Sequence, residues 1–159
     1  MWDRLLLAMD RSESDQSALA LAVGLAAPSR ASVIVLHVRE RSRCLRIPPL
    51  ESMDQARHLV DDAVGTLLAG GTDALGVVLS ADRQDVARSI VSEAAARSCA
   101  AIVLGSTRQR GLRRLNGSGI RERVIRQSSL PVLLAPPALH CRTRLPDATA
   151  PDPEPIGHV

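Results

Sequence analysis

Residues 33–38 read Val-Ile-Val-Leu-His-Val, the clearest strand pattern in the chain. β-Branched residues favour strands, and a continuous, mostly apolar run is typical of a parallel strand that is buried on both faces. Four shorter apolar runs of the same kind lie at residues 5–9, 75–79, 101–104 and 132–135. We therefore expect five strands, with a polar loop over residues 39–50 after the second of them.

Segments with helical periodicity separate these strands. Ser12, with Asp15 three residues later, forms a start that is similar to a capping box, and Pro28 predicts the end of that helix. Apolar residues at helical spacing predict two further long helices, around residues 56–67 and 87–95, and residues 120–127 predict a short fourth one. Alternating strands and helices indicate an α/β fold: an open five-stranded parallel sheet with right-handed crossovers and helices on both faces.

One domain accounts for residues 1–136. Beyond them the pattern stops, because residues 136–159 contain six of the ten prolines and little apolar clustering. We expect residues 137–159 to be a disordered tail. The longest apolar run, residues 18–27, is shorter than the roughly 20 residues that a membrane span needs, and no signal peptide is evident. The expected location is the cytoplasm, without membrane insertion.

The composition excludes several classes of site. The chain has no Lys, which rules out a Lys Schiff base and a P-loop, and it has no Tyr, no Phe and one Trp, which disfavours reading of nucleic acid by base stacking. Its three cysteines have no metal-ligand spacing, and no pattern assigns a catalytic role to any of the four histidines. Residues 105–127 hold seven Arg and one Glu, so the positive charge is concentrated in one segment that suits an anion.

Ligands of parallel sheets bind beyond the carboxyl ends of the strands, where the strand order reverses. Two strand ends are the most informative in this respect: Asp10, in Asp10-Arg11-Ser12, follows the first strand, and Gly105 follows the fourth. The chain resembles the universal stress protein family over residues 2–136. The residues that carry the resemblance are these two strand ends, His37-Val38, the Arg-rich residues 110–115 and the segments 122–126 and 130–134.

The resemblance implies a sheet with strand order 3-2-1-4-5, of the adenine nucleotide alpha-hydrolase type. It also implies a homodimer through the fifth strand, Val132 to Ala135, and ATP in the cleft between strands one and four, as in many members of the family. In ATP-binding members an aspartate at the position of Asp10 accepts a hydrogen bond from the adenine amino group. The candidate nucleotide-binding residues carried over from the family are Asp10, Val38, Gly105, Arg108, Gly117, Ser118 and Gly119.

The glycine motif departs from the family pattern, which is Gly, two residues, Gly, nine residues, then Gly-Ser or Gly-Thr. Gly105 matches the first glycine, but the second falls on Arg108. The final pair falls either on Ser118-Gly119, in reversed order, or on Gly117-Ser118 with a spacing of eight. A glycine allows close approach of the ligand to the backbone, which Arg108 would hinder. Backbone N–H groups at a helix start and nearby Arg side chains can still hold phosphate, so we expect weak, salt-sensitive ATP binding.

Two functions remain open at this stage. The first is a regulatory or binding module of the stress response with a degenerate nucleotide cleft, acting through its dimer and its Arg-rich loop on an unidentified protein partner. The alternative is a functional ATP-binding sensor whose partner interaction depends on nucleotide. ATP hydrolysis is less favoured, because no residue is identifiable that would position water; we therefore expect no catalytic residues and no metal, and no nucleic acid as a partner.

Overall fold

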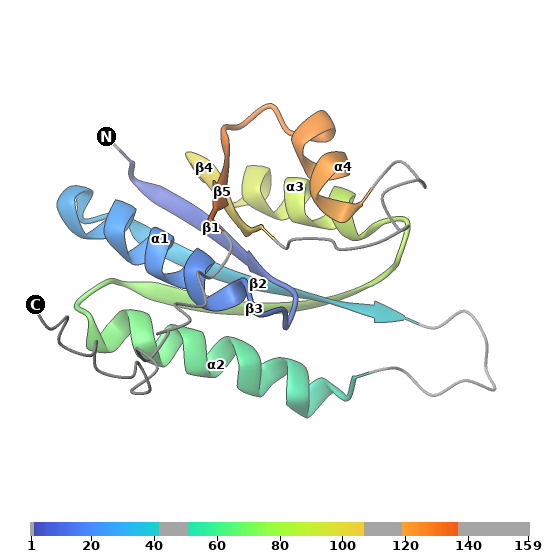
Figure 1. Cartoon of the computed structure of the whole chain (residues 1–159), viewed down its shortest axis with the longest axis horizontal. Coiled ribbons are helices and arrows are strands. Elements are labelled where there is room, and N and C mark those ends of the chain that lie inside the picture. The colour runs from blue at the N-terminus through green and yellow to red at the C-terminus, as the bar shows by residue number, and fades with distance from the viewer. Residues whose placement is uncertain (1, 42–50, 107–118, 137–159) are drawn as a thin grey trace, which may run out of the picture.

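The computed structural model describes residues 2–41, 51–106 and 119–136. In this part of the chain, five parallel strands form one sheet in the order β3-β2-β1-β4-β5 (Figure 1). The strands are β1 (Arg4–Met9), β2 (Ser32–Arg41), β3 (Ala74–Asp82), β4 (Ala101–Gly105) and β5 (Val132–Ala135). The helices are α1 (Asp15–Ser29), α2 (Met53–Ala69), α3 (Val86–Ala96) and α4 (Ile120–Gln127). The predicted α/β fold and strand order are confirmed.

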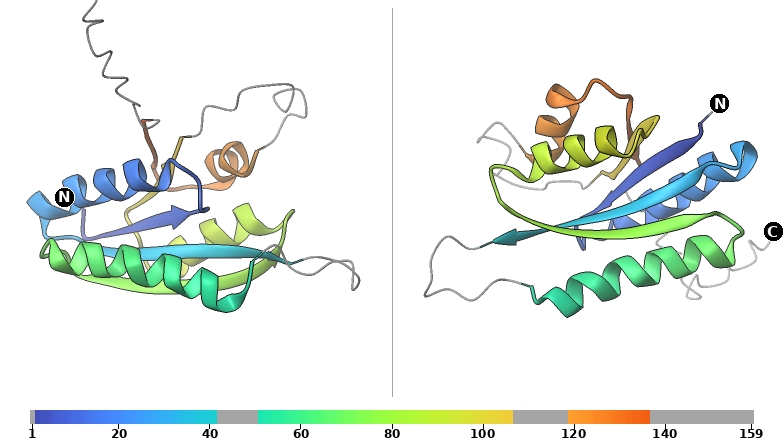
Figure 2. Two further views of the ribbon diagram at one scale, coloured as in Figure 1. Left: turned by 60° about the horizontal axis from the view of Figure 1, so that its bottom comes forward. Right: turned by 180° about the vertical axis from the view of Figure 1, so that it is seen from behind.

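The helices cover the two faces of the sheet in pairs. Helices α1 and α2 pack on one face, and α3 and α4 pack on the other (Figure 2). Each face has its own hydrophobic cluster, because successive side chains of a strand point to opposite sides. In β1, for example, Leu5 and Leu7 belong to the first cluster and Leu6 to the second, and all three are completely buried.

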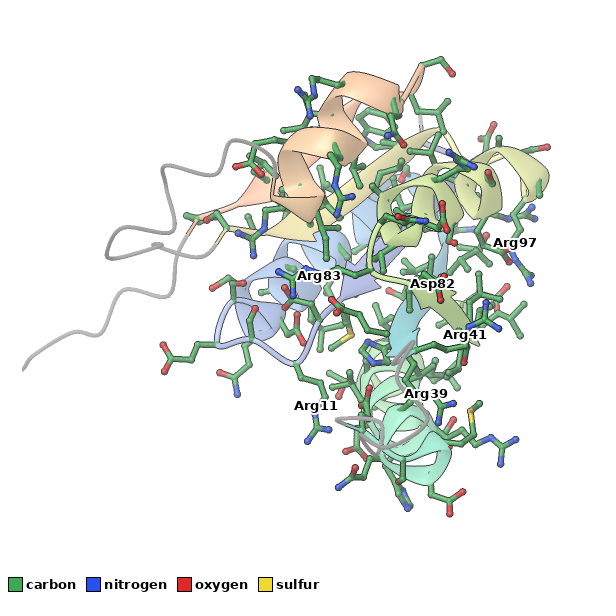
Figure 3. The ribbon with its side chains drawn as sticks, turned by 90° about the vertical axis from the view of Figure 1, so that its right-hand side faces the viewer. Arg11, Arg39, Arg41, Asp82, Arg83 and Arg97 are labelled. Atoms are coloured by element: carbon green, nitrogen blue, oxygen red, sulfur yellow. The ribbon has the colours of Figure 1, made fainter. Side chains whose placement is uncertain are left out.

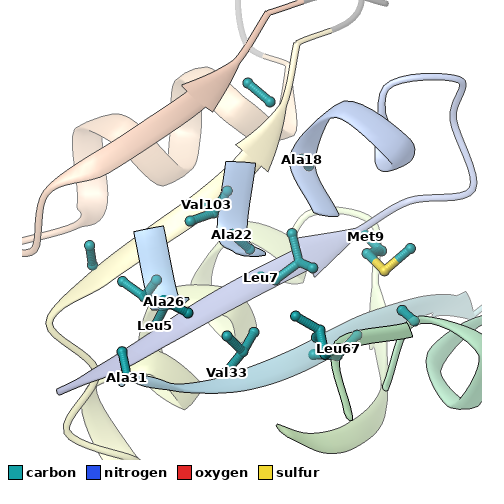
Figure 4. Packing of buried hydrophobic residues seen from close by; sticks show 14 of the residues in the cluster. Leu5, Leu7, Met9, Ala18, Ala22, Ala26, Ala31, Val33, Leu67 and Val103 are labelled. Atoms are coloured by element: carbon teal, nitrogen blue, oxygen red, sulfur yellow. The ribbon is translucent and has the colours of Figure 1, made fainter. Parts of the chain in front are cut away.

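The first cluster depends on small residues of α1. Ala18, Ala22 and Ala26 lie one turn apart on the helix face that meets the sheet, and all are buried (Figure 4). An alanine face lets the helix axis approach the sheet closely, so that Leu7 and Val103 fill the remaining space. This packing explains how a core forms without Phe or Tyr.

The second and third strands are longer than the sequence predicted. Residues 39–41 were expected in a loop, but β2 continues to Arg41 and pairs with β3 up to Asp82. Backbone hydrogen bonds of the ladder do not depend on side-chain polarity, so charged residues can extend a strand beyond its apolar part. The side chains of Arg41 and Asp82 lie 3.9 Å apart and face the same side of the molecule (Figure 3).

The first helix also differs from the prediction. It begins at Asp15, and Ser14 precedes it without a side-chain cap, so the expected capping box from Ser12 is wrong. Pro28 does not end the helix but lies inside its last turn, which closes at Ser29. A proline there removes one hydrogen bond at the frayed end of the helix, where the loss is tolerated.

The expected tail, residues 137–159, lies outside the described residues. Among the residues that are described, no helix is long and apolar enough to cross a membrane.

Candidate functional site

A cavity of about 320 Å³ opens at the carboxyl ends of β1, β2 and β4. After β1 the chain crosses to α1 on one face of the sheet, whereas α4, beyond β4, lies on the other face. The cavity therefore occupies the place where the strand order reverses, which is the usual ligand site of parallel sheets. We call it the cleft.

The cleft has apolar walls and a charged rim. Its apolar lining comes from strand ends and from α3 and α4, and comprises Ala8, Met9, Leu36, Val38, Leu104, Val86, Ile90 and Ile120. Its polar lining comprises Asp10, Arg11, His37, Glu40, Glu51, Arg83 and Arg121. A pocket of this size with apolar walls and a few convergent polar groups is typical of a small-molecule site.

Asp10 stands at the mouth of the cleft, directly after β1. One carboxylate oxygen accepts the backbone N–H of Ser12 at 3.1 Å, and the other lies 3.7 Å from Nη2 of Arg121 on α4. The side chain of Asp10 is 59% exposed, so a ligand can reach it. The guanidinium of Arg121 competes for the oxygen that would accept a ligand N–H.

The buried carboxylate of Asp15 holds the turn after β1, which consists of Asp10 and Arg11. The backbone N–H groups of Asp10 and Arg11 donate to the two oxygens of Asp15 at 3.2 and 2.8 Å. Burial, together with the nearby charge of Asp10, raises the pKa of Asp15 to about 6, against the lowering effect of the two N–H donors. The sequence pattern assigned Asp15 to a helix cap, and no local signal showed that its carboxylate would reach back to the preceding turn.

A second polar network joins the turn to β2 and to Glu51, two residues before α2. Arg11 Nη1 lies 3.2 Å from Glu51 Oε1, and His37 Nε2 lies 2.7 Å from Glu51 Oε2. His37 Nδ1 donates to the carbonyl of Met9 at 2.8 Å, since a carbonyl can only accept. The contact between His37 and Glu51 therefore holds a second proton, which makes it a charge-assisted bond or a carboxyl donating to imidazole. No pattern in the sequence predicted a role for His37 or for Glu51.

The structure describes two of the predicted glycines, Gly105 and Gly119. Gly105 ends β4 and lines the cleft, but a Cβ added there would lie 2.9 Å from the backbone oxygen of Ser14. Close packing of β4 against the start of α1 is thus sufficient reason for this glycine. Gly119 is the residue before α4, and the next two residues, Ile120 and Arg121, line the cleft.

Of the seven predicted site residues, Asp10, Val38 and Gly105 line the cleft together, and Gly119 adjoins it without lining it. Arg108, Gly117 and Ser118 lie outside the described residues. Arg83 and Arg11 lie at the same end of the molecule, which faces the viewer in Figure 3, and the Arg83 guanidinium is 3.8 Å from Glu40. Within the described ranges, no group of three or more His, Cys, Asp or Glu residues could hold a metal ion.

The model of the universal stress protein family matches residues 1–136. This chain belongs to the universal stress protein family. Among curated proteins, no sequence matches it significantly.

Solved universal stress proteins share the fold. A family member from Burkholderia pseudomallei is 24% identical with a TM-score of 0.67, covering 86% of this chain and 96% of the other. One from Archaeoglobus fulgidus in complex with dAMP is 20% identical with a TM-score of 0.65, covering 84% and 98%. A universal stress protein in complex with cAMP is 19% identical with a TM-score of 0.67, covering 86% and 98%.

Proposed function

We propose that this universal stress protein is a regulatory binding module whose cleft takes an adenine nucleotide weakly. The observation that carries the proposal is the cleft itself, at the switch point of the sheet, with apolar walls and an accessible carboxylate at its mouth. Two proteins of the same fold have been solved with dAMP and cAMP, which supports an adenine nucleotide as the ligand class.

The chemistry of the lining fits the parts of such a ligand. A flat heteroaromatic base can lie between Val38 and the apolar side chains of α3 and α4, where it replaces water. Asp10 at the mouth offers a carboxylate oxygen to the amino group of the base. Arg83 and Arg121, which also line the cleft, supply positive charge for phosphate oxygens.

The same geometry argues for weak rather than tight binding. An adenine amino group that donates to Asp10 Oδ2 must share that oxygen with the Arg121 guanidinium, which lies 3.7 Å away. The charge on Arg83 is partly balanced by Glu40, and that on Arg11 by Glu51. Each of these pairs lowers the net gain from bringing in an anionic ligand, because an existing charge contact is exchanged for a new one.

Calorimetric titration of ATP, AMP and adenosine into the purified protein tests this function. The wild type is expected to bind ATP with a Kd between about 1 μM and 1 mM, more weakly at higher salt. Asp10→Ala is expected to weaken binding, whereas the control Asp61→Ala, an exposed carboxylate on α2, should not change it. No binding by the wild type, or equal binding by Asp10→Ala, would refute the proposal.

We also propose that the protein is a homodimer through β5, which forms one edge of the sheet. Leu134 in this strand is 46% exposed and Ile125 on α4 is 47% exposed, so the edge carries apolar surface as well as unpaired backbone groups. Leu133 packs against the core, and Leu134 is therefore the better position for a test. Leu134→Lys should give monomers by light scattering, and the control Leu75→Lys, at the β3 edge, should remain dimeric. A monomeric wild type would contradict the dimer.

In this proposal, bound nucleotide changes how the dimer binds a protein partner. The interaction takes place in the cytoplasm and belongs to a stress response. No residue is assigned a catalytic role.

A further inference from the structure

The turn that carries Asp10 and Arg11 is held from outside the cleft. Asp15, the first residue of α1, is 7% exposed, and its carboxylate accepts the backbone N–H groups of both turn residues. Asp15 does not line the cleft but lines a second cavity of about 390 Å³ between α1 and α2. The two cavities share Met9 and Arg11, so Asp15 and a ligand in the cleft would act on opposite sides of the same turn.

The turn has a backbone conformation that needs such support. Arg11 has a φ of 63°, in the left-handed region that residues with a Cβ seldom adopt. Such a conformation persists only where surrounding contacts hold it in place. For Arg11, those contacts are the 2.8 Å bond from its N–H to Asp15 and the ion pair of its side chain with Glu51. The bond to Asp15 is the one that acts directly on the strained backbone.

We propose that Asp15 is a positioning residue of the cleft: its charged carboxylate holds the Asp10–Arg11 turn in the ligand-binding arrangement, and loss of that charge releases the turn. The effect on ligand affinity rests on the proposed nucleotide binding. The effect on the turn does not, and it can be measured on the protein alone.

The surroundings of Asp15 raise its pKa, so that it gains or loses its charge at mildly acidic pH. Burial, and then the charge of Asp10, raise the pKa of Asp15 to about 6. The charged groups near it are Asp10 and Arg11 in the turn and Asp62 on α2, which lines the same cavity. Once protonated, Asp15 loses one acceptor oxygen and can donate to the Asp10 carboxylate, which draws that group away from a ligand.

The size of the effect follows from this pKa. The ionised fraction of Asp15 is roughly 0.9 at pH 7 and roughly 0.1 at pH 5, so the affinity for nucleotide should fall about tenfold between them. Asp15→Asn keeps the shape of the side chain but offers a single acceptor oxygen. At pH 7 it should bind ATP about tenfold more weakly than wild type. The ratio of the two affinities should approach one at pH 5, and because both titrations use ATP, the titration of its phosphates cancels in that ratio.

Two measurements test the proposal, with Asp62→Asn as the control for another carboxylate of the same cavity. In ¹⁵N NMR spectra without nucleotide, the amide signals of Asp10 and Arg11 should titrate with a midpoint near pH 6 in wild type and in Asp62→Asn, but not in Asp15→Asn. In calorimetry, Asp62→Asn should keep the wild-type pH profile of ATP affinity and Asp15→Asn should lose it.

The outcomes separate this proposal from the function it builds on. If wild type binds no ATP at any pH, nucleotide binding fails, while the amide titration still decides the role of Asp15. If the two amides do not titrate near pH 6 in wild type, or if Asp15→Asn keeps the wild-type affinity and pH profile, the positioning role is overturned. The wild-type amide titration also gives an answer if Asp15→Asn does not fold.

Discussion

Gly105→Ala measures how closely β4 packs against the start of α1. A Cβ at Gly105 would lie 2.9 Å from the backbone oxygen of Ser14, where ordinary contacts begin at 3.4 Å. The oxygen belongs to the backbone and cannot rotate away, so α1 or β4 must shift by a few tenths of an ångström. Overpacking of this kind costs about 1–3 kcal/mol. Alanine suits a strand better than glycine by roughly 0.5–1 kcal/mol, so the middle of the two ranges leaves an expected net loss of about 1.3 kcal/mol.

The control adds the same methyl group where nothing is in its way. Gly24 lies inside α1, and a Cβ there has no atom within 4 Å. Gly24→Ala should stabilise the protein by about 0.5–1 kcal/mol, because alanine favours a helix interior. Equilibrium urea denaturation of the two variants and wild type gives all three free energies of unfolding. A Gly105→Ala variant as stable as wild type would show that this glycine is not required by packing.

Further predictions concern Val124, Asp15 and the pH dependence of stability. Val124→Ala, at a completely buried position, should lower the free energy of unfolding by about 2 kcal/mol, while the control Leu68→Ala, at an exposed position on α2, should change it by less than about 0.5 kcal/mol. The folded protein holds the Asp15 proton more tightly than the unfolded chain, so between about pH 4 and pH 6 this group makes stability fall as pH rises, with no further change above. Urea denaturation across that range should show a smaller fall for Asp15→Asn, and equal profiles would contradict the raised pKa of Asp15.

The strands could be predicted from the sequence because its strongest signals are continuous apolar runs, which a folded protein buries. The apolar runs of β1 and β4 are buried on both faces, as their continuity predicted. The strand order came from the family resemblance, since periodicity alone does not determine which strands are neighbours. The carboxyl end of β2 could not be predicted, because Arg39 and Arg41 continue the strand through backbone pairing with β3, which does not depend on apolar side chains.

The candidate site could be predicted only in part. Asp10, Val38 and Gly105 were placed at strand ends, and a parallel sheet necessarily brings such ends to one edge. Glu51 meets His37 across 14 positions in the sequence, and no local pattern shows such a contact. Arg121 was noted only as part of a basic segment, and its approach to Asp10 depends on where α4 packs.

The most direct test of the central claim is a ¹⁵N NMR titration of the wild-type protein with ATP, because it shows both binding and its place. Binding in the cleft predicts saturable shifts of the amides of Asp10, Arg11, Val38, Gly105 and Arg121, with small shifts at the far end of the sheet. These shifts should decrease as salt is added. No saturable shifts, or shifts confined to residues that do not line the cleft, would contradict the assignment of the cleft as a nucleotide site.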